Sequence, residues 1–153
     1  VLIHSGETIT GLSRYVTDDT RALINEFWPG QLSLNLHPNM GLNWNLGDNN
    51  GLDIFNVRAP KAPFVSALLK ESGPLAVASA ARVGQKPALT TDRIFTLESD
   101  LAVMFDGGEL PAGPATTIVQ SDVDGMTIIR EGAITRAQLA AVVPGLTDEQ
   151  PIG

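Results

Sequence analysis

QLSLNL, residues 31–36, places a leucine at every second position with a polar residue on either side. Strict alternation of this kind predicts a β-strand with one buried face, because successive side chains of a strand point to opposite sides. The segment before it, residues 17–27, predicts a helix, since Thr17 and two aspartates offer N-caps and apolar side chains then recur at helical spacing. Pro29-Gly30 ends that helix. A helix that leads into a half-buried strand is therefore the starting point of the fold.

The rest of the chain continues this succession of strands and helices. Pro63 suits a first helical position and Gly73-Pro74 a helix end, while Thr135 and Gln138 form a capping box that opens a last helix through Val143. We expect further strands at residues 1–4, 52–58, 75–78, 101–105, 117–120 and 126–130, and a short helix at 91–97. The wholly apolar run 75–78 predicts a central strand, joined to 52–58 by a parallel crossover. This pattern indicates an open α/β sheet.

Residues 37–51 are rich in asparagine and glycine and predict a loop or hairpin. Leu42, Trp44 and Leu46 alternate within it, and we expect them to attach this excursion to the body of the protein by alternate burial.

Length and composition predict one domain, residues 1–153. A chain of 16.2 kDa with 43% hydrophobic and 18% charged residues can bury one sizeable core. It has no cysteine, which excludes disulfides, thiolate metal sites and cysteine nucleophiles. No apolar run is long enough for a bilayer and no secretory signal is present, so we expect a cytoplasmic protein without a membrane partner. Because Val1 begins in what reads as the middle of a strand, we treat the chain as a fragment truncated at its N-terminus.

The charge balance disfavours general binding of nucleic-acid backbone. Ten basic residues stand against 17 acidic ones, a net charge of -7, whereas such binding requires the opposite balance. Any contact with RNA must be local, and the best local cluster is Arg82, Lys86 and Arg93. Asp92 interrupts it, so a solvated face is the favoured interpretation.

Polar residues that end apolar runs are the first candidates for a site, because ligands of open α/β sheets bind beyond the carboxyl ends of strands. Four qualify: His4, Arg58, Ser79 and Arg130. The two arginines carry planar forks suited to carboxylate or phosphate, and Ser79 lies among small residues that allow close approach to the backbone. Together they predict an anion site, although each also has a plain structural interpretation as a solvated strand end or a turn residue.

Other chemistries have less support. Thr116-Thr117 enters a predicted strand and could place a hydroxyl on phosphate, but threonine is also simply a good strand residue. The loop 106–114 lacks the lysine of a phosphate-binding P-loop, and a plain connection is favoured. His4 and His37 lack metal-ligand spacing, so we predict no metal site. No acid–base pair for catalysis is evident.

Several blocks occur in an order that resembles one family. They are FWPGQLSL at 27–34, VRAP at 57–60, GPLA at 73–76 with SAA at 79–81, Gly84, and IREG at 129–132. Over nearly the whole chain these blocks resemble the YrdC-like family, also called threonylcarbamoyl-AMP synthases. The resemblance implies an open twisted mixed α/β sheet with flanking helices, a fold likened to the double-stranded-RNA-binding domain, and a concave, positively charged cavity.

The resemblance also implies an activity. Family members condense threonine, bicarbonate and ATP with Mg²⁺ into threonylcarbamoyl-AMP and pyrophosphate, the intermediate for a tRNA adenosine modification, and no tightly bound cofactor is expected. Partners would be tRNA or tRNA-modification proteins. Two alternatives stay open: a non-catalytic RNA- or nucleotide-binding translation-associated factor, and a carbamoyl-transfer relative on the same fold.

Carried over residue by residue, the resemblance implies that His4 lies near threonine and that Arg58 is the arginine of the family's Arg-x-Pro strand. It matches Ser79 with the first member of a Ser-x-Asn pair at the nucleotide, Thr116-Thr117 with a Ser-Thr pair, and Arg130 with an arginine near the phosphates. The asparagine of the Ser-x-Asn pair is Ala81 here, and the upstream Pro-Thr-x-Thr and Lys-x-Arg segment is absent from this sequence. We therefore expect this chain by itself not to complete the reaction.

Overall fold

The computed structural model describes residues 1–46, 51, 53–81, 85–94 and 101–148, and these contain a five-stranded mixed sheet. The strand order is β2-β1-β3-β4-β5. Strand β1 pairs in parallel with β3 and antiparallel with β2, while β4 pairs antiparallel with β3 and in parallel with β5. The strands are β1 (Leu32–Leu36), β2 (Phe55–Val57), β3 (Thr117–Ser121), β4 (Met126–Arg130) and β5 (Thr147–Asp148). The predicted open mixed sheet with flanking helices is confirmed.

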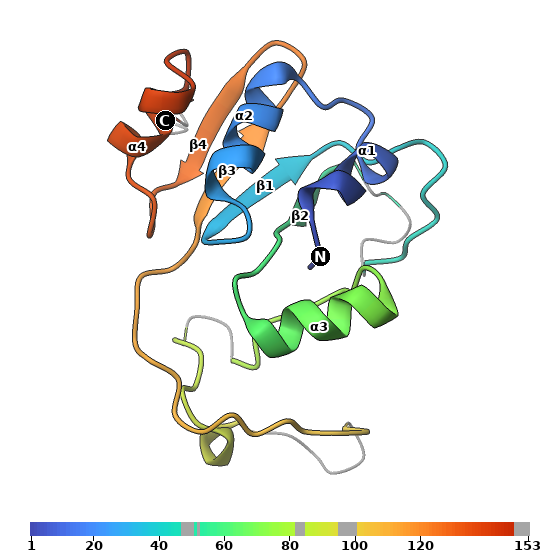
Figure 1. Ribbon diagram of the computed structural model, residues 1–153, viewed down its shortest axis with the longest axis vertical. Helices are drawn as coiled ribbons and strands as arrows, with labels where there is room; N and C mark the ends of the chain where they lie inside the picture. The colour runs from blue at the N-terminus through green and yellow to red at the C-terminus, as the bar shows by residue number, and fades with distance from the viewer. Residues whose placement is uncertain (47–50, 52, 82–84, 95–100, 149–153) are drawn as a thin grey trace. The chain divides into compact units, whose positions relative to one another are not determined.

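Alternation along the strands sorts their side chains between two faces. Leu32, Leu34 and Leu36 are fully buried on one face together with residues of β2, β3 and β4. In Figure 1, α2 (Asp18–Phe27) and α4 (Arg136–Val142) lie over this face. The opposite face of β1 carries Ser33 and Asn35, the polar residues of the alternating stretch. The apolar core thus lies between the sheet and α2 and α4, and the other face of the sheet carries polar groups.

The helices begin where the sequence predicts. The hydroxyl of Thr17 accepts a hydrogen bond from the backbone N–H of Thr20 at the start of α2, and Thr135 with Gln138 forms the predicted capping box of α4. Helix α3 (Pro63–Ser72) begins with its proline and ends before Gly73, which adopts φ +77°. The short helices η1 (Gly6–Thr8) and α1 (Ile9–Leu12) lie in a segment for which the sequence made no prediction.

Two predicted strands in the first half of the chain are reduced to single bridging residues. In residues 1–4 only Leu2 forms bridges, parallel to Arg58 on one side and antiparallel to Leu75 on the other. The run 75–78 contributes only Leu75, and Val77 is 54% exposed. Because Leu2 runs with Arg58 and against Leu75, the predicted parallel crossover is wrong as well. Within the run 75–78, only Leu75 pairs with another backbone segment, at Leu2, so no continuous strand forms.

The chain divides into two compact units. The sheet belongs to a larger unit, Val1–Ala76 with Pro114–Gly153, and the smaller unit is Val77–Gly113. The described part of the smaller unit has one element, η2 (Thr91–Arg93), a 3-10 turn in place of the start of the predicted helix at 91–97; residues 95–97 lie outside the described residues. The predicted strand 101–105 is wrong, because these residues form no described ladder and Phe105 is 62% exposed.

Two of the three apolar residues that were expected to attach the segment after β1 to the core do so. Residues 37–46 form no helix or strand, and Leu42 and Trp44 are half-buried against the core. The Trp44 ring meets Phe55 of β2 edge-on, with 6.2 Å between ring centroids. Leu46, by contrast, is exposed. Residues 47–50 and 52 lie outside the described residues.

Candidate anion-binding site

Arg58 follows β2 directly and reaches across to the residue that precedes β1. Its Nη1 donates a hydrogen bond to Oε1 of Gln31 at 3.0 Å. The side chain is half-buried, and this burial lowers the pKa of Arg58 from its ordinary value. Arginine starts so high on the pH scale that the guanidinium stays protonated at neutral pH. Arg58 is therefore a fixed positive charge held by a neutral amide.

Arg130, the last residue of β4, bonds to the entry of β3. Its Nε and Nη2 donate to the carbonyl oxygen of Thr116 at 3.1 and 2.8 Å, and Nη2 also donates to the Thr116 hydroxyl at 3.0 Å. The hydroxyl of Ser33, which is only 4% exposed, makes a longer contact of 3.4 Å with the same Thr116 oxygen. Thr116 thus connects Arg130 to the polar face of β1.

The strand register brings these groups to one end of the sheet. Leu32 pairs with Thr117, Leu34 with Val57, and Ile118 with Arg130. Arg58 and Arg130 consequently end strands on either side of the β1 and β3 entries. Since neighbouring strands lie about 4.8 Å apart, their backbones are separated by three spacings, or about 14 Å.

Neither arginine is neutralised in the part of the chain that the structure describes. The ion pairs found there join His37 to Asp122 and Arg136 to Asp148. Two guanidinium groups without carboxylate partners, on long side chains at one end of a sheet, can bind an anion of the size of a polyphosphate. Both groups therefore carry the charge and the donors that an anion site requires.

Thr117 lies on the other face of the sheet from Thr116, because adjacent residues of a strand point in opposite directions. Its side chain is 0% exposed, donates to the carbonyl oxygen of Ile134 at 2.6 Å and accepts from the N–H groups of Gly132 and Ile134 at 3.0 and 2.9 Å. Its hydroxyl is fully engaged inside the protein. Thr117 holds the loop after β4 and is not brought together with the arginines.

His4 lies next in the chain to Ile3, whose N–H donates to the carbonyl oxygen of Arg58 at 3.0 Å. His4 is therefore close to the end of the sheet that carries Arg58. The Nδ1 atom of His4 lies 3.0 Å from the carbonyl oxygen of Ser66 in α3. A carbonyl only accepts, so this contact favours a proton on Nδ1 and leaves Nε2 without a partner among the described residues.

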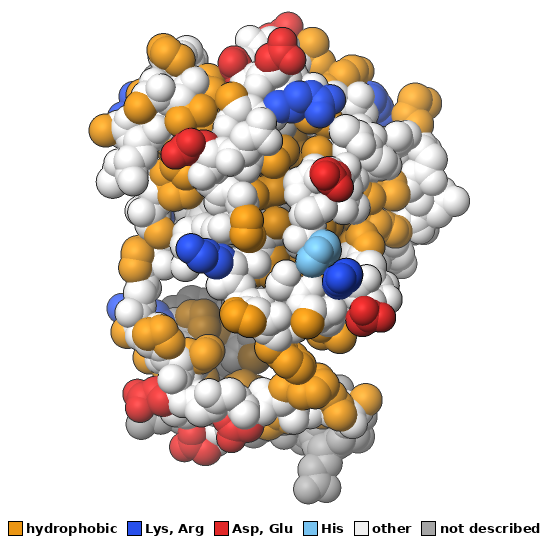
Figure 2. Space-filling view, viewed as in Figure 1, with side chains coloured by type: hydrophobic (Ala, Val, Ile, Leu, Met, Phe, Trp, Pro, Cys, Tyr) orange, Lys and Arg blue, Asp and Glu red, His pale blue; other side chains and the backbone are white. Residues whose placement is uncertain are grey.

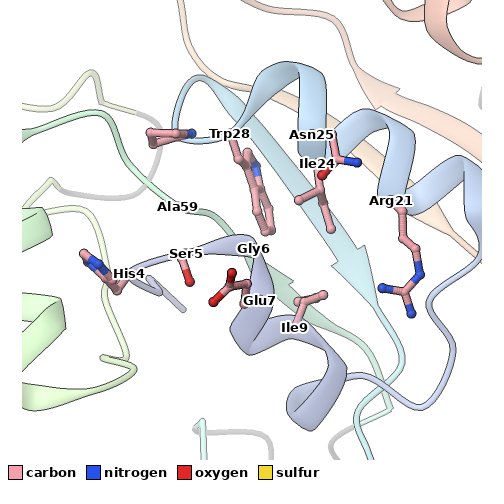
Figure 3. A pocket seen from close by; sticks show the side chains of 11 residues that line it. His4, Ser5, Gly6, Glu7, Ile9, Arg21, Ile24, Asn25, Trp28 and Ala59 are labelled. Atoms are coloured by element: carbon pink, nitrogen blue, oxygen red, sulfur yellow. The ribbon is translucent and has the colours of Figure 1, made fainter.

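His4 also lines a cavity of about 570 Å³ between the N-terminal segment and α2. Figure 3 shows the Trp28 ring entering it beside Ile24, with His4, Ser5 and Glu7 on the opposite side and Arg21 along α2. The cavity therefore combines an aromatic wall with side chains of both charges, which suits a small ligand that carries both charges.

The comparison with protein families decides the relationship. The family Sua5_yciO_yrdC, described as "Telomere recombination", matches residues 1–132. The chain belongs to this family. It is the YrdC-like family that the sequence blocks resemble, so that prediction is confirmed.

Named relatives of this YrdC-like chain are synthases. A candidate threonylcarbamoyl-AMP synthase of Mycobacterium tuberculosis is 36% identical over 146 residues, which covers 94% of this chain and 65% of the relative. The threonylcarbamoyl-AMP synthase of Bacillus subtilis is 31% identical and covers 88% of this chain and 42% of the relative. The chain thus spans less than two thirds of the length of these relatives.

The fold agrees with solved structures of the family. Pyrococcal Sua5 (P. abyssi), solved in complex with L-threonine, superposes with a TM-score of 0.83 at 23% identity, over 97% of this chain and 44% of that one. A second structure, of a variant of the same protein, also gives a TM-score of 0.83. At this level of identity the likeness establishes the fold of the YrdC-like chain.

Ser79 belongs to the smaller unit, where it is exposed in a segment without regular structure. Its assignment to the nucleotide stays a prediction.

Of the basic cluster considered from the sequence, Arg82 lies outside the described residues. Figure 2 draws one face of the YrdC-like chain, on which Lys and Arg side chains are interspersed with Asp and Glu side chains and with uncharged groups.

Sequence reasoning missed Gln31 and Ser33, which contact Arg58 and Thr116. The signal was present, because the alternation that predicts β1 also places its polar residues on one face. What the sequence lacked was the register that sets arginines across from them.

A second polar cluster lies at the other end of β1 and β3. His37 Nε2 lies 2.7 Å from Oδ1 of Asp122, and its Nδ1 lies 3.1 Å from the carbonyl oxygen of Asp53. Burial would raise the pKa of Asp122, but hydrogen bonds from His37 and Gln120 together with the charge of His37 lower it below its ordinary value. Both ring nitrogens of His37 face protein oxygens, so the pair fastens the loop after β1.

Metal and membrane features are absent from the described parts of this YrdC-like chain. Among those residues, no group of three or more histidine, aspartate or glutamate side chains could hold a metal ion. No helix there is long and apolar enough to cross a bilayer.

Proposed function

We propose that this chain is part of an L-threonylcarbamoyladenylate synthase. The enzyme would convert threonine, bicarbonate and ATP to threonylcarbamoyl-AMP and pyrophosphate, for modification of tRNA in the cytoplasm. The observation that carries the proposal is the pair of unneutralised arginines, Arg58 and Arg130, at one end of the sheet. It occurs in a chain 31% to 38% identical to proteins named as such synthases.

The arginines would hold the phosphates of ATP. A guanidinium offers two parallel N–H donors to a phosphate, and the charge that develops on the transferring α-phosphate is stabilised by fixed positive groups around it. Thr116 would add a hydroxyl beside Arg130. Positioning and electrostatics, with no covalent intermediate on the protein, would supply most of the rate. Mg²⁺ would enter as the phosphate-bound partner of ATP.

Threonine would bind in the cavity beside His4. The supporting facts are its aromatic wall, its side chains of both charges and its position next to the Arg58 backbone. A structural relative of the same fold has been solved with L-threonine. From the family blocks of the sequence, we propose that Ser79 is a nucleotide-binding residue and that residues 1–153 belong to one family domain.

The alternative of an RNA-binding factor has weaker support. The net charge is -7, whereas binding of RNA backbone needs a surface of clustered positive charge. We propose that tRNA is instead the substrate of the later modification step, which consumes the threonylcarbamoyl-AMP that this protein helps to make.

Pyrophosphate release tests the proposed reaction. The full-length protein that contains this chain is supplied with ATP, Mg²⁺, threonine and bicarbonate, and release is compared between wild type and Arg130→Ala. We expect kcat/KM to fall about 10- to 100-fold, because a charge-assisted contact to phosphate is lost. Arg136→Ala is the matched control, since Arg136 pairs with Asp148 and lies on α4. Threonine-independent release, or equal rates for the two variants, would contradict the proposal.

A further inference from the structure

Gln31 has a backbone fixed on both sides. Its carbonyl oxygen accepts from the N–H of Thr117 at 3.0 Å, and the N–H of the preceding Gly30 donates to the carbonyl oxygen of Ala59 at 2.9 Å. A Cβ on Gly30 would lie 2.3 Å from the carbonyl oxygen of Phe27, so the chain turns tightly before Gln31. The side chain of Gln31 therefore projects from a defined point beside Arg58.

The contact between Gln31 and Arg58 has a particular chemistry. Oε1 of Gln31 accepts from Nη1 of Arg58 at 3.0 Å, and no other side chain among the described residues bonds to that guanidinium. An amide oxygen orients a guanidinium as a carboxylate would, but it does not neutralise the charge. The remaining N–H donors of Arg58 stay available for a ligand.

We propose that Gln31 is a positioning residue of the anion site. It limits the rotamers of Arg58 and leaves its full positive charge for the phosphates, and this inference rests on the proposed function. A long flexible side chain loses conformational freedom when it binds a ligand, so an arginine held in place beforehand binds more tightly.

Two substitutions separate orientation from charge. Gln31→Met keeps the length of the side chain and removes the acceptor, so the affinity for ATP with Mg²⁺ should fall about 2- to 10-fold. Gln31→Glu keeps an acceptor but pairs with Arg58 and repels phosphate, so the affinity should fall further, about 10- to 100-fold. Asn35→Asp is the matched control, because it adds the same charge on the same face of β1 about 13 Å away, where the native side chain accepts from Asn56.

The experiment is a calorimetric titration of ATP with Mg²⁺ into these variants of the protein that is tested for pyrophosphate release. The same substitutions are also titrated in an Arg58→Ala background. We expect Gln31→Met to weaken binding in the wild-type background and to have no further effect without Arg58. An undiminished effect in the Arg58→Ala background would overturn the inference, because Gln31 would then act directly or through the fold.

A second readout needs no nucleotide. The NMR order parameter of the Arg58 Nε–H group should fall in Gln31→Met and stay unchanged in Asn35→Asp. An unchanged value in Gln31→Met would overturn the positioning role even if ATP binds. If wild type binds no ATP, the proposed function fails and the role of Gln31 in the site fails with it. ATP binding that depends on Arg58 but is equal in Gln31→Met overturns the inference alone.

Discussion

Thr117→Val removes one hydroxyl from the core and keeps the shape of the side chain. That hydroxyl makes three hydrogen bonds, to the carbonyl of Ile134 and from the N–H groups of Gly132 and Ile134, at a position with no solvent exposure. Each net hydrogen bond contributes about 1 kcal/mol, and a buried N–H without an acceptor costs about 1–3 kcal/mol. Allowing for relaxation of the loop after β4, the free energy of unfolding should fall by about 2–4 kcal/mol. A loss of this size is a large fraction of the 5–15 kcal/mol typical of a domain.

Urea denaturation at neutral pH measures this loss through the transition midpoint at a constant slope. Thr127→Val is the matched control, because the Thr127 hydroxyl is exposed and makes a single contact of 3.3 Å with Thr147. We expect it to change stability by less than about 0.5 kcal/mol. If Thr117→Val cost less than about 1 kcal/mol, the structural role assigned to Thr117 would be wrong. If it also weakened ATP binding, Thr117 would be a ligand-binding residue.

Two further changes test neighbouring features. Gly132→Ala should destabilise the protein by about 2 kcal/mol or more in the same urea assay, since a Cβ there would lie 2.2 Å from the carbonyl oxygen of Ala115. Gly145→Ala is the control and should be near neutral, because no atom lies within 4 Å of a Cβ at that position. Equal effects of the two substitutions would contradict the steric account. Burial raises the pKa of Asp122, but the hydrogen bonds from His37 and Gln120 and the charge of His37 together bring it below its ordinary value. The stabilisation from this carboxylate is therefore present above the unfolded pKa of about 3.9 and is lost as pH falls through the lower folded pKa. Unfolding measured from pH 6 down to pH 2 should show that wild type loses up to about 1 kcal/mol more than Asp122→Asn, and parallel curves would contradict this.

The elements that the sequence predicted well are those defined by local patterns. Strand β1 follows from alternation, α2 and α4 from their caps and apolar spacing, and each buries the face that its pattern indicates. The runs 75–78 and 101–105 are equally apolar but form no strand, because a strand also needs a backbone partner, and hydrophobicity does not report one. The single bridge of Leu75 shows how little pairing was available there.

The candidate site was predictable to the extent that strand ends meet at one edge of a sheet. Arg58 and Arg130 end strands in the sequence and lie at the same end in the structure. The choice between Thr116 and Thr117 was not predictable, since adjacent residues face opposite sides and only the pairing of Leu32 with Thr117 fixes which one joins the arginines. The contact of Gln31 with Arg58 depends on the same register.

Binding of ATP with Mg²⁺, followed by calorimetry on the same protein that is tested for pyrophosphate release, tests the central claim most directly. The account predicts binding by wild type, a loss of about 10- to 100-fold in affinity for Arg58→Ala and for Arg130→Ala, and little change for Arg136→Ala. Binding that is equally strong in all three variants would contradict an anion site built on Arg58 and Arg130, and no binding by wild type would contradict the proposed function as well.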